Sequence, residues 1–361
     1  MSVLNPPLAR PMSTNSPLRR RMRRFTAVSG MTLLAIMVVT AFLLPLLFMV
    51  TTSFKDKSQL TALGAPWYPA AQETFEYEGR TYPLYVVPLE DGTTQSLALY
   101  RAGREASTWV DPANPNAAPF EWEGRWRTLA PEYRLEFYTN NFVTAWNALE
   151  FPRLLFNTLM IAGIGTIGAV TSAICVAYGF SRFRFPGRNG LFLLLLSTII
   201  LPMQVTLIPT YAVFSIMGWT GTWLPLTVPY FFGNAYNVFL LRQYFLTIPR
   251  ELDEAAMIDG AGPFRILRSV IVPQAKAAIV AVSLFHFFWA WNEFYLPLIY
   301  LQGNQSAEPL STAIARFNGV YSQEPTLIQA AAIMAMIIPV IVFFLAQRAF
   351  MRGIVFSGVE K

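Results

Sequence analysis

Charged residues are scarce in this chain, and the scarcity is concentrated in long uninterrupted stretches. Only 13% of the 361 residues are charged, and 54% are hydrophobic, whereas soluble domains carry about 25% charged residues. Residues 25–54, 154–181, 189–241 and 325–347 contain no Asp, Glu, Lys or Arg. A helix needs about 20 apolar residues to cross a hydrocarbon core about 30 Å thick. These stretches therefore predict a membrane protein, since core helices of soluble proteins alternate with polar faces.

Cysteine, histidine and nucleotide-binding motifs are also missing or nearly so. Cys175 is the only cysteine and His286 the only histidine, which excludes an intramolecular disulfide and argues against a His-based metal cluster. No metal site is predicted. The phosphate-binding motif Gly-x-x-x-x-Gly-Lys-Ser/Thr is absent as well. We therefore expect that the chain is not an enzyme, does not hydrolyse ATP by that route and binds no cofactor itself.

Six membrane-spanning helices are predicted from the apolar stretches. The run at 189–241 is too long for one helix, because at about 1.5 Å per residue it would extend about 80 Å. It contains the turn sequence Met-Gly-Trp-Thr-Gly-Thr at 217–222, so we divide it there. A further span near 277–300 is interrupted only by His286 and Glu293. The spans are placed near residues 26–52, 154–180, 190–216, 223–245, 277–300 and 327–350.

The basic residues predict the orientation of these spans. Residues 1–24 carry an arginine cluster and no acidic residue, and positive segments beside a span stay in the cytoplasm. Arginines also follow the second span, at 182, 184 and 188, and the sixth, at 348 and 352. Both termini are therefore expected in the cytoplasm, and the net charge of +6 reflects topology rather than nucleic-acid binding. The first apolar run far exceeds the 7–15 residues or so of a signal peptide, so it is expected to remain as a span.

The segment between the first two spans has a different character. Aromatic and charged residues flank a glycine at 75–82 and again at 120–127. Asp91 and Gly92 form a hairpin signal between the apolar runs 84–89 and 97–100. This pattern predicts a small antiparallel β-rich insertion, placed outside the cell membrane by the topology. Its acidic residues are scattered at turns, so we favour a docking or lining role over an enzymatic one.

The predicted fold is thus an all-α polytopic membrane protein with five parts. Residues 1–24 form a disordered basic cytoplasmic tail, 25–54 the first transmembrane helix and 55–150 the extracytoplasmic β-rich insertion. Residues 151–350 form the core with transmembrane helices 2–6, and residues 351–361 a cytoplasmic tail. Within the core, residues 247–274 form a charged cytoplasmic loop.

This charged loop predicts two short helices joined by an elbow. Pro249 and the acidic residues at 251, 253 and 254 suit a helix N-terminus. Gly260 and Gly262 end that helix, and Pro263 can open a second one. The second helix carries arginines at 265 and 268, and Pro273 is expected to end it before the fifth span. A rigid knob of mixed charge suits docking into a groove on another protein.

The loop resembles the signature of importer permeases, in which Glu-Ala-Ala is followed by Gly and then by an aliphatic-x-aliphatic-Pro sequence. The matching residues are Glu254, Ala255, Ala256, Gly260, Val270, Val272 and Pro273. Other matches are Asn157 and Thr158, and the segments 177–188, 202–205, 241–243 and 291–294. The resemblance covers about residues 140–361 and the first span. It is strongest for the shorter, six-span partner of carbohydrate importers of the maltose and glycerol-phosphate type, which usually has a shorter loop at 56–150.

The resemblance implies a bacterial inner-membrane importer built from two permease subunits and an ATPase dimer. An extracytoplasmic binding protein would deliver a sugar, and the ATPase would hold the ATP and Mg. The implied coupling residues are Glu254, Ala255, Ala256, Asp259, Gly260, Arg265 and Pro273. Among them, Glu254 would pair with a cation on the ATPase, and Gly260 would permit the elbow. The alternative solute is a non-sugar such as glycerol phosphate.

Polar and aromatic residues within the spans are candidates for the substrate path or gate. Aromatic rings stack on sugars and amides bind hydroxyls, but Trp and Tyr also mark membrane interfaces, and polar groups also join helices. The candidates are His286, Trp289, Trp291, Asn292, Glu293, Tyr295, Gln204, Asn234 and Asn237. A secondary transporter, a channel or a membrane enzyme would need more intramembrane charge or paired acids. The identity of the sugar, that of the partner permease and the subunit that contacts the substrate remain open at this level.

Overall fold

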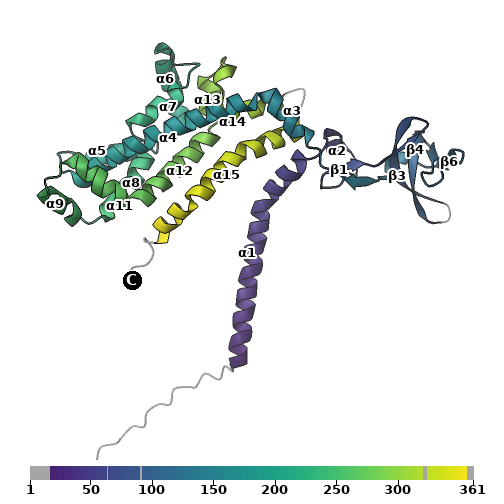
Figure 1. Cartoon of the computed structure of the whole chain (residues 1–361), viewed down its shortest axis with the longest axis horizontal. Helices are drawn as coiled ribbons and strands as arrows, with labels where there is room; N and C mark the ends of the chain where they lie inside the picture. Colours follow the sequence, from purple (N-terminus) through teal and green to yellow (C-terminus); the bar gives the residue numbers. More distant parts are fainter. Residues whose placement is uncertain (1–16, 63, 90–91, 320–322, 356–361) are drawn as a thin grey trace, which may run out of the picture. The chain divides into compact units, whose positions relative to one another are not determined.

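Long helices dominate the computed structural model, which describes residues 17–62, 64–89, 92–319 and 323–355 (Figure 1). The longest are α1 (Pro17–Ser53), α4 (Phe151–Arg182) and α15 (Pro325–Val355). The chain divides after Thr51 into two compact units, so that most of α1 forms one unit and the remainder of the chain the other. By length and composition, helices α1, α4 and α15 can each cross a membrane.

The other three predicted spans are broken into shorter helices. Residues 190–216 contain α5 (Arg188–Ser197) and α6 (Met203–Ile216), separated before Pro202, which lacks a backbone N–H. Residues 223–245 contain α7 (Leu224–Thr227), the 3-10 helix η2 (Val228–Phe232) and α8 (Ala235–Thr247). Residues 277–300 contain α12 (Lys276–Asn292) and α13 (Tyr295–Tyr300). The count of six spans is therefore not confirmed.

Proline and glycine account for the breaks at Pro202 and Gly233. Between η2 and α8, Gly233 takes a φ of +93°, which a residue with a Cβ rarely adopts. Before α12, the segment Pro263–Gln274 meets Lys276–Asn292 at an 81° bend, and the pair would count as a fourth span if it crosses as one. The structure thus provides three, or at most four, helices of spanning length within the described residues.

The N-terminal prediction needs one correction. Residues 1–24 were expected to be disordered, but α1 begins at Pro17, so the arginines from 19 to 24 are helical. A helical start is consistent with these residues because Leu, Arg and Met are all good helix formers. Residues 1–16, and 356–361 of the expected C-terminal tail, lie outside the described part of the chain.

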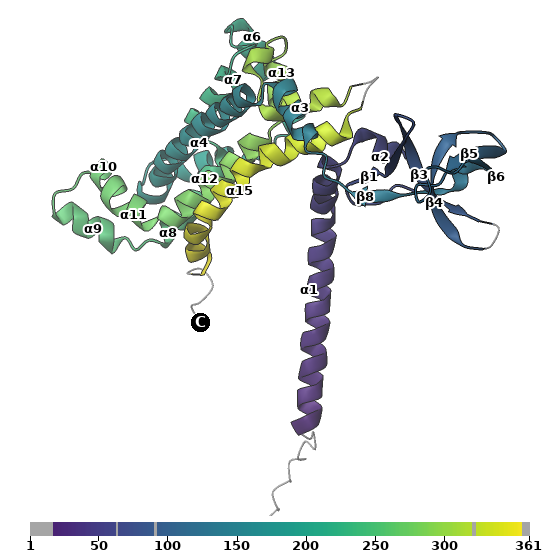
Figure 2. The ribbon, with the colours of Figure 1, turned by 45° about the vertical axis from the view of Figure 1, so that its right-hand side comes forward.

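Eight short strands occupy the segment between α1 and α4 (Figure 2). Their bounds are β1 (Ala70–Gln72), β2 (Thr74–Tyr77), β3 (Arg80–Pro88), β4 (Thr94–Arg101), β5 (Ala106–Val110), β6 (Phe120–Glu123), β7 (Ala130–Pro131) and β8 (Tyr133–Leu135). Strands β2 to β6 pair in sequence order, β7 joins β3, and β1 pairs separately with β8. The short helix α2 (Lys57–Thr61) precedes β1.

The two aromatic–glycine patterns have different outcomes. At 75–82 the chain forms the β2–β3 hairpin around Gly79, whose φ is +73°. At 120–127, β6 ends at Glu123, Gly124 has a φ of +150°, and the 3-10 helix η1 (Trp126–Thr128) follows, so no second hairpin forms there. Between β3 and β4, Gly92 takes a turn conformation with a φ of +81°, whereas Asp91 lies outside the described residues.

The β segment has its own apolar interior. Trp109 is fully buried among Val87, Leu97 and Leu99, one row of residues from three adjacent strands. Tyr85 and Trp122 contact the Trp109 ring edge to face. The residues that alternate with these along the strands form a second, smaller cluster around Leu84, Ala98 and Val110, so the centre of the sheet is covered on both faces.

Helix α4 is the centre of the helical part, where it packs along α8 and α12 (Figure 1). The interface on α4 is lined by small residues, including Ala173 and Ala177, which are fully buried. Toward the start of α4, Leu154 packs with Trp291 of α12 and Ala331 of α15. Small side chains let helices approach closely, which is the usual way in which membrane helices associate.

Gly168 of α4 packs closely against the Phe231 ring of η2, so a larger residue at this position is predicted to destabilise the protein. A Cβ added at Gly168 would lie 2.5 Å from the Phe231 ring, whereas one added at Gly163 would meet no described atom within 4 Å. Gly168→Ala is therefore expected to lower the free energy of unfolding by about 1–3 kcal/mol through overpacking. Thermal unfolding of the purified protein measures this effect.

The matched control is Gly163→Ala in the same helix. Here the substitution only improves helix propensity, by up to about 1 kcal/mol, so the melting temperature should stay unchanged or rise slightly. Equal melting temperatures for the two variants would show that the α4–η2 contact is looser than the structure indicates.

Candidate functional site

The charged loop forms a helix, an elbow and a second helix. Helix α9 (Glu251–Ile258) has three acidic residues in its first turn, and the elbow follows at Gly260, where φ is +78°. Helix α10 (Pro263–Ile266) opens at Pro263 and continues through a π-helical turn, η3 (Leu267–Ile271), into α11 (Val272–Gln274). The predicted helix–elbow–helix is confirmed. Pro273, expected to end the second helix, instead lies within α11.

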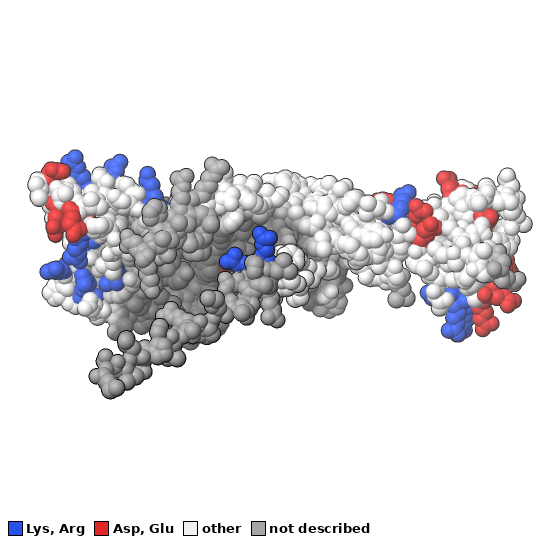
Figure 3. Space-filling model, turned by 90° about the horizontal axis from the view of Figure 1, so that it is seen from below, with Lys and Arg blue, Asp and Glu red and all other residues white. Residues whose placement is uncertain are grey.

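Most of the predicted coupling residues are exposed. Glu254, Ala255, Asp259, Gly260, Arg265 and Pro273 are exposed, and Ala256 is half-buried against the helical core. Large apolar side chains stand beside them: Ile258 is 87% exposed and Phe264 75% exposed. Of the apolar residues between 263 and 267, only Ile266 and Leu267 are buried. Figure 3 shows acidic and basic side chains gathered at the end of the molecule that carries α9 and α10.

A buried ion pair attaches this loop to α4. Arg182, the last residue of α4, lies 2.9 Å from Asp253 of α9, and the two side chains are only 6% and 9% exposed. Burial raises the pKa of the Asp253 carboxyl, and the Arg182 guanidinium acts against that rise. Sequence reasoning used Arg182 as a marker of topology and as part of the family-like segment 177–188, and it left Asp253 out of the site. Nothing in the sequence pairs two residues so far apart along the chain.

Three further hydrogen bonds reinforce this attachment. Arg182 donates to the Ile248 carbonyl at 3.0 Å, and Arg250 donates to the Ser181 carbonyl at 3.4 Å. The Tyr178 hydroxyl donates to the Pro263 carbonyl at 3.1 Å. The bonds reach both sides of the elbow, so α9 and α10 are held to the end of α4 as one unit.

The candidate path residues divide into two groups, and four of them surround one pocket. Asn234 and Asn237 of the α8 start, and His286 and Trp289 of α12, line a cavity of about 320 Å³. The Asn237 amide lies 3.3 Å from Nδ1 of His286. The Asn234 side chain caps α8 by accepting a hydrogen bond from the Asn237 backbone N–H. Two aromatic residues that sequence reasoning missed complete the lining: Tyr236 and Phe285.

The other five candidates do not line this pocket. Trp291 is buried in the apolar cluster around Leu154, and the Asn292 amide donates to the Phe288 carbonyl of its own helix. The Glu293 carboxylate accepts from the backbone N–H groups of residues 295 and 296 and so caps α13. Tyr295 and Gln204 are exposed on α13 and α6. Glu293 does border a second cavity, but at about 10 Å³ it holds at most one water.

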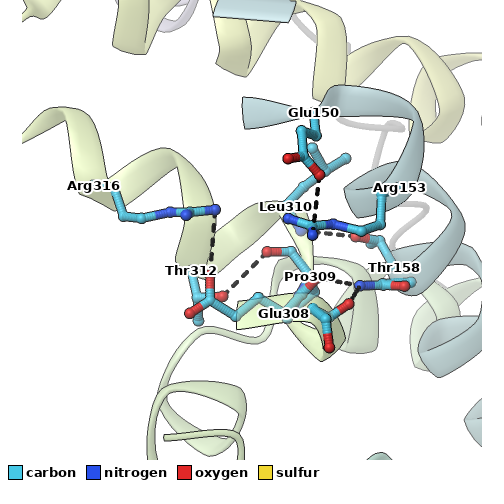
Figure 4. Close-up of polar contacts among 10 residues, drawn as sticks. Glu150, Arg153, Thr158, Glu308, Pro309, Leu310, Thr312 and Arg316 are labelled. Carbon is cyan, nitrogen blue, oxygen red and sulfur yellow. Dashed lines mark hydrogen bonds and ion pairs between the residues drawn. The ribbon is translucent and has the colours of Figure 1, made fainter. Parts of the chain in front are cut away.

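The Asn157–Thr158 pair, near the opposite end of α4 from Arg182, clamps a loop. The Asn157 amide donates to the carbonyls of Ser306 and Glu308, both at 2.8 Å. The Thr158 hydroxyl accepts from the Leu310 N–H at the start of α14 (Leu310–Ile314), as Figure 4 shows. Both side chains are almost fully buried. The motif that the sequence analysis noted as a resemblance therefore has a structural role in this chain.

Comparison with known proteins agrees with this architecture. Residues 165–355 match the family described as binding-protein-dependent transport system inner membrane component. The chain is 34% identical over 227 residues to the osmoprotective compounds uptake permease protein GgtD of Synechocystis sp., covering 63% of this chain and 76% of that one. It is 36% identical over 216 residues to the sn-glycerol-3-phosphate transport system permease protein UgpE of Yersinia enterocolitica, covering 58% and 75%.

The fold is also similar to a solved structure, that of a bacterial ABC transporter involved in the import of the acidic polysaccharide alginate. The TM-score is 0.64 at 18% identity, and the match covers 91% of this chain and 98% of that chain. The chain therefore belongs to the family of inner membrane components of binding-protein-dependent transport systems and is an integral membrane permease subunit of an importer.

The buried ion pair predicts that each single substitution destabilises the protein more than the double substitution does. Arg182→Met or Asp253→Leu alone leaves one charge buried without its partner, which costs about 3–5 kcal/mol in comparable pairs. The double variant removes both charges and should recover most of that loss. Thermal unfolding of the four proteins in detergent measures the coupling. Additive losses in the double variant would contradict a direct interaction.

Proposed function

We propose that this chain is one of two permease subunits of a bacterial inner-membrane ABC importer, driven by a separate ATPase dimer. The solute is a sugar or a related polar compound brought by an extracytoplasmic binding protein. Family membership supports the role as an importer permease. The names of the relatives, one for osmoprotective compounds and one for sn-glycerol-3-phosphate, support a small polar solute.

The topology of this proposal follows the charge distribution. The arginines near residues 19–24, 182–188 and 348–352 place both termini and the α9–α10 loop in the cytoplasm. Six crossings then require that the broken segments α5–α6, α7–α8 and α12–α13 each cross the membrane as discontinuous helices. Such breaks are tolerated where they are covered by protein or line a water-filled path. The β segment lies on the opposite side.

The observation that carries the ATPase proposal is the construction of the α9–α10 loop. A buried ion pair holds the loop to the end of α4. The outer surface of the loop carries the Glu254 carboxylate and the exposed side chains of Ile258 and Phe264. Exposed apolar residues flanked by charge are typical of protein-binding surfaces. Because the loop is fixed to α4 and exposes a binding surface, a movement of a docked ATPase can be transmitted through the loop to α4. ATP and Mg would be bound by that partner.

A pull-down tests this docking surface. The tagged chain is co-expressed with its genomic neighbours and purified in mild detergent, wild type against Glu254→Lys. Wild type is expected to retain an ATPase and a second permease. The variant should lose at least about 90% of the ATPase, because reversing the charge turns an attraction into repulsion, and should keep the second permease.

The matched control is Glu121→Lys, an equal charge reversal at an exposed position of β6. It should leave ATPase recovery unchanged. If wild type purifies alone, the proposed assembly with an ATPase dimer and a second permease is contradicted. If Glu254→Lys retains the ATPase as wild type does, the loop is not the main docking contact.

The β segment is proposed to dock the binding protein or to line its approach. Its two ends are joined by the β1–β8 ladder, and the Glu73 N–H donates to the Glu132 carbonyl at 2.8 Å. Residues 74–131 can therefore be replaced by a short Gly-Ser linker with the ladder kept. This deletion is expected to lower uptake at limiting binding protein at least about fivefold, with the ATPase still bound. Unchanged uptake would remove the β segment from the transport path.

A further inference from the structure

The pocket between α8 and α12 combines features of a carbohydrate site and lacks those of an anion site. Its volume of about 320 Å³ is at the lower end of the range for small-molecule pockets, about 300–1,000 Å³. All six lining residues are uncharged side chains: Asn234, Tyr236, Asn237, Phe285, His286 and Trp289. The question is which kind of solute such a lining can hold.

The polar groups of the pocket are fixed and partly unused. Asn237 is 2% exposed and His286 is 5% exposed, and the contact between the Asn237 amide and His286 Nδ1 sets the orientation of both. Asn237 donates through its nitrogen there, which leaves its Oδ1 as an acceptor without a partner among the described residues. Asn234 accepts through its oxygen at the α8 cap, which leaves its amide N–H groups as donors. One acceptor and a pair of donors suit hydroxyl groups, which both give and receive hydrogen bonds.

The aromatic groups provide the complementary surface. Trp289 and Tyr236 are 45% and 49% exposed, so the described residues leave part of each side chain uncovered. A sugar ring has an apolar face of C–H groups and a rim of hydroxyls. The aromatic side chains can cover the apolar face of the sugar, and the asparagine amides can bind its hydroxyl groups. The pocket therefore offers both kinds of contact within one cavity.

An anionic solute finds no partner in the same pocket. An ionised phosphate or carboxylate moved out of water needs a cation or several strong donors, and its burial without them is costly. The lining holds no Lys or Arg. Glu293, which follows the end of α12 and caps α13, is acidic, so the first charged residue after Trp289 in the sequence is an anion and not a cation.

We propose that this pocket is a binding site for an uncharged polyhydroxylated solute, a mono- or disaccharide or a polyol glycoside, and that it does not take phosphorylated or acidic sugars. This proposal rests on the proposed importer function and adds that this subunit itself contacts the solute. Trp289 is the stacking residue, and Asn237 is the hydrogen-bonding residue whose orientation His286 maintains.

The test uses the complete transporter, purified with its partner subunits. Saturation-transfer NMR detects direct binding of maltose and trehalose as uncharged probes and of glycerol 3-phosphate as the anionic probe. Wild type is expected to bind at least one uncharged probe, and binding should weaken at least tenfold in Trp289→Ala and in Asn237→Ala. Glycerol 3-phosphate should give no signal that these substitutions remove.

Trp146→Ala is the matched control, because Trp146 of α3 (Asn140–Leu149) is 44% exposed, almost as Trp289 is, and lies outside the pocket. It should bind the probes as wild type does. ATP hydrolysis by each complex is measured in parallel and shows whether the variants still assemble.

The outcomes separate the two proposals. Binding of glycerol 3-phosphate that Trp289→Ala abolishes, or probe binding that survives both pocket substitutions, would overturn the uncharged-solute site and leave the importer function standing. Loss of binding in Trp146→Ala to the same extent as in Trp289→Ala would also overturn it, since the effect would then be general. A wild-type chain that recovers no ATPase would instead count against the proposed function.

Discussion

Helix α4 is the constraint on which the rest of the helical part depends, because it is anchored by buried polar groups near both ends. Near one end, Asn157 and Thr158 bind the backbone that leads into α14. At the other, Arg182 pairs with Asp253 of α9. Because both anchors are buried, breaking either one leaves polar groups without partners, which is costly, so each anchor specifies one position for the segment it holds. A displacement of α9 must therefore move α4 or break a buried ion pair.

The contacts along α4 complement these anchors. Between them, small residues such as Gly168 and Ala173 let η2, α8 and α12 approach closely. The pocket proposed for the solute is lined by residues of α8 and α12, the same helices that pack on α4. A displacement of the α9–α10 loop therefore acts on α4, which packs against both helices that line the pocket. In the proposed importer, this arrangement is the physical route from a docked ATPase to the pocket.

Much of the fold could be predicted because its signals are local. Uninterrupted apolar runs identified α1, α4 and α15. An alternating pattern around a glycine identified the β2–β3 hairpin, and the Asp91–Gly92 turn signal identified the β3–β4 hairpin. Gly260 and Pro263 placed the elbow and the start of α10 because each limits its own backbone angles. The breaks within the other three spans were not predicted, since an apolar run has the same composition whether its helix is continuous or interrupted.

The sequence by itself determined the membrane class of this protein and the place of the α9–α10 loop. Only the tertiary structure decided that Arg182 meets Asp253, that Asn237 meets His286, and that Trp291 and Glu293 serve packing and capping instead of the pocket. The physical reason is the separation along the sequence of the residues that interact. Helix ends and turns depend on neighbouring residues, whereas a pair or a pocket depends on how distant helices pack, and one chain's pattern does not record that packing.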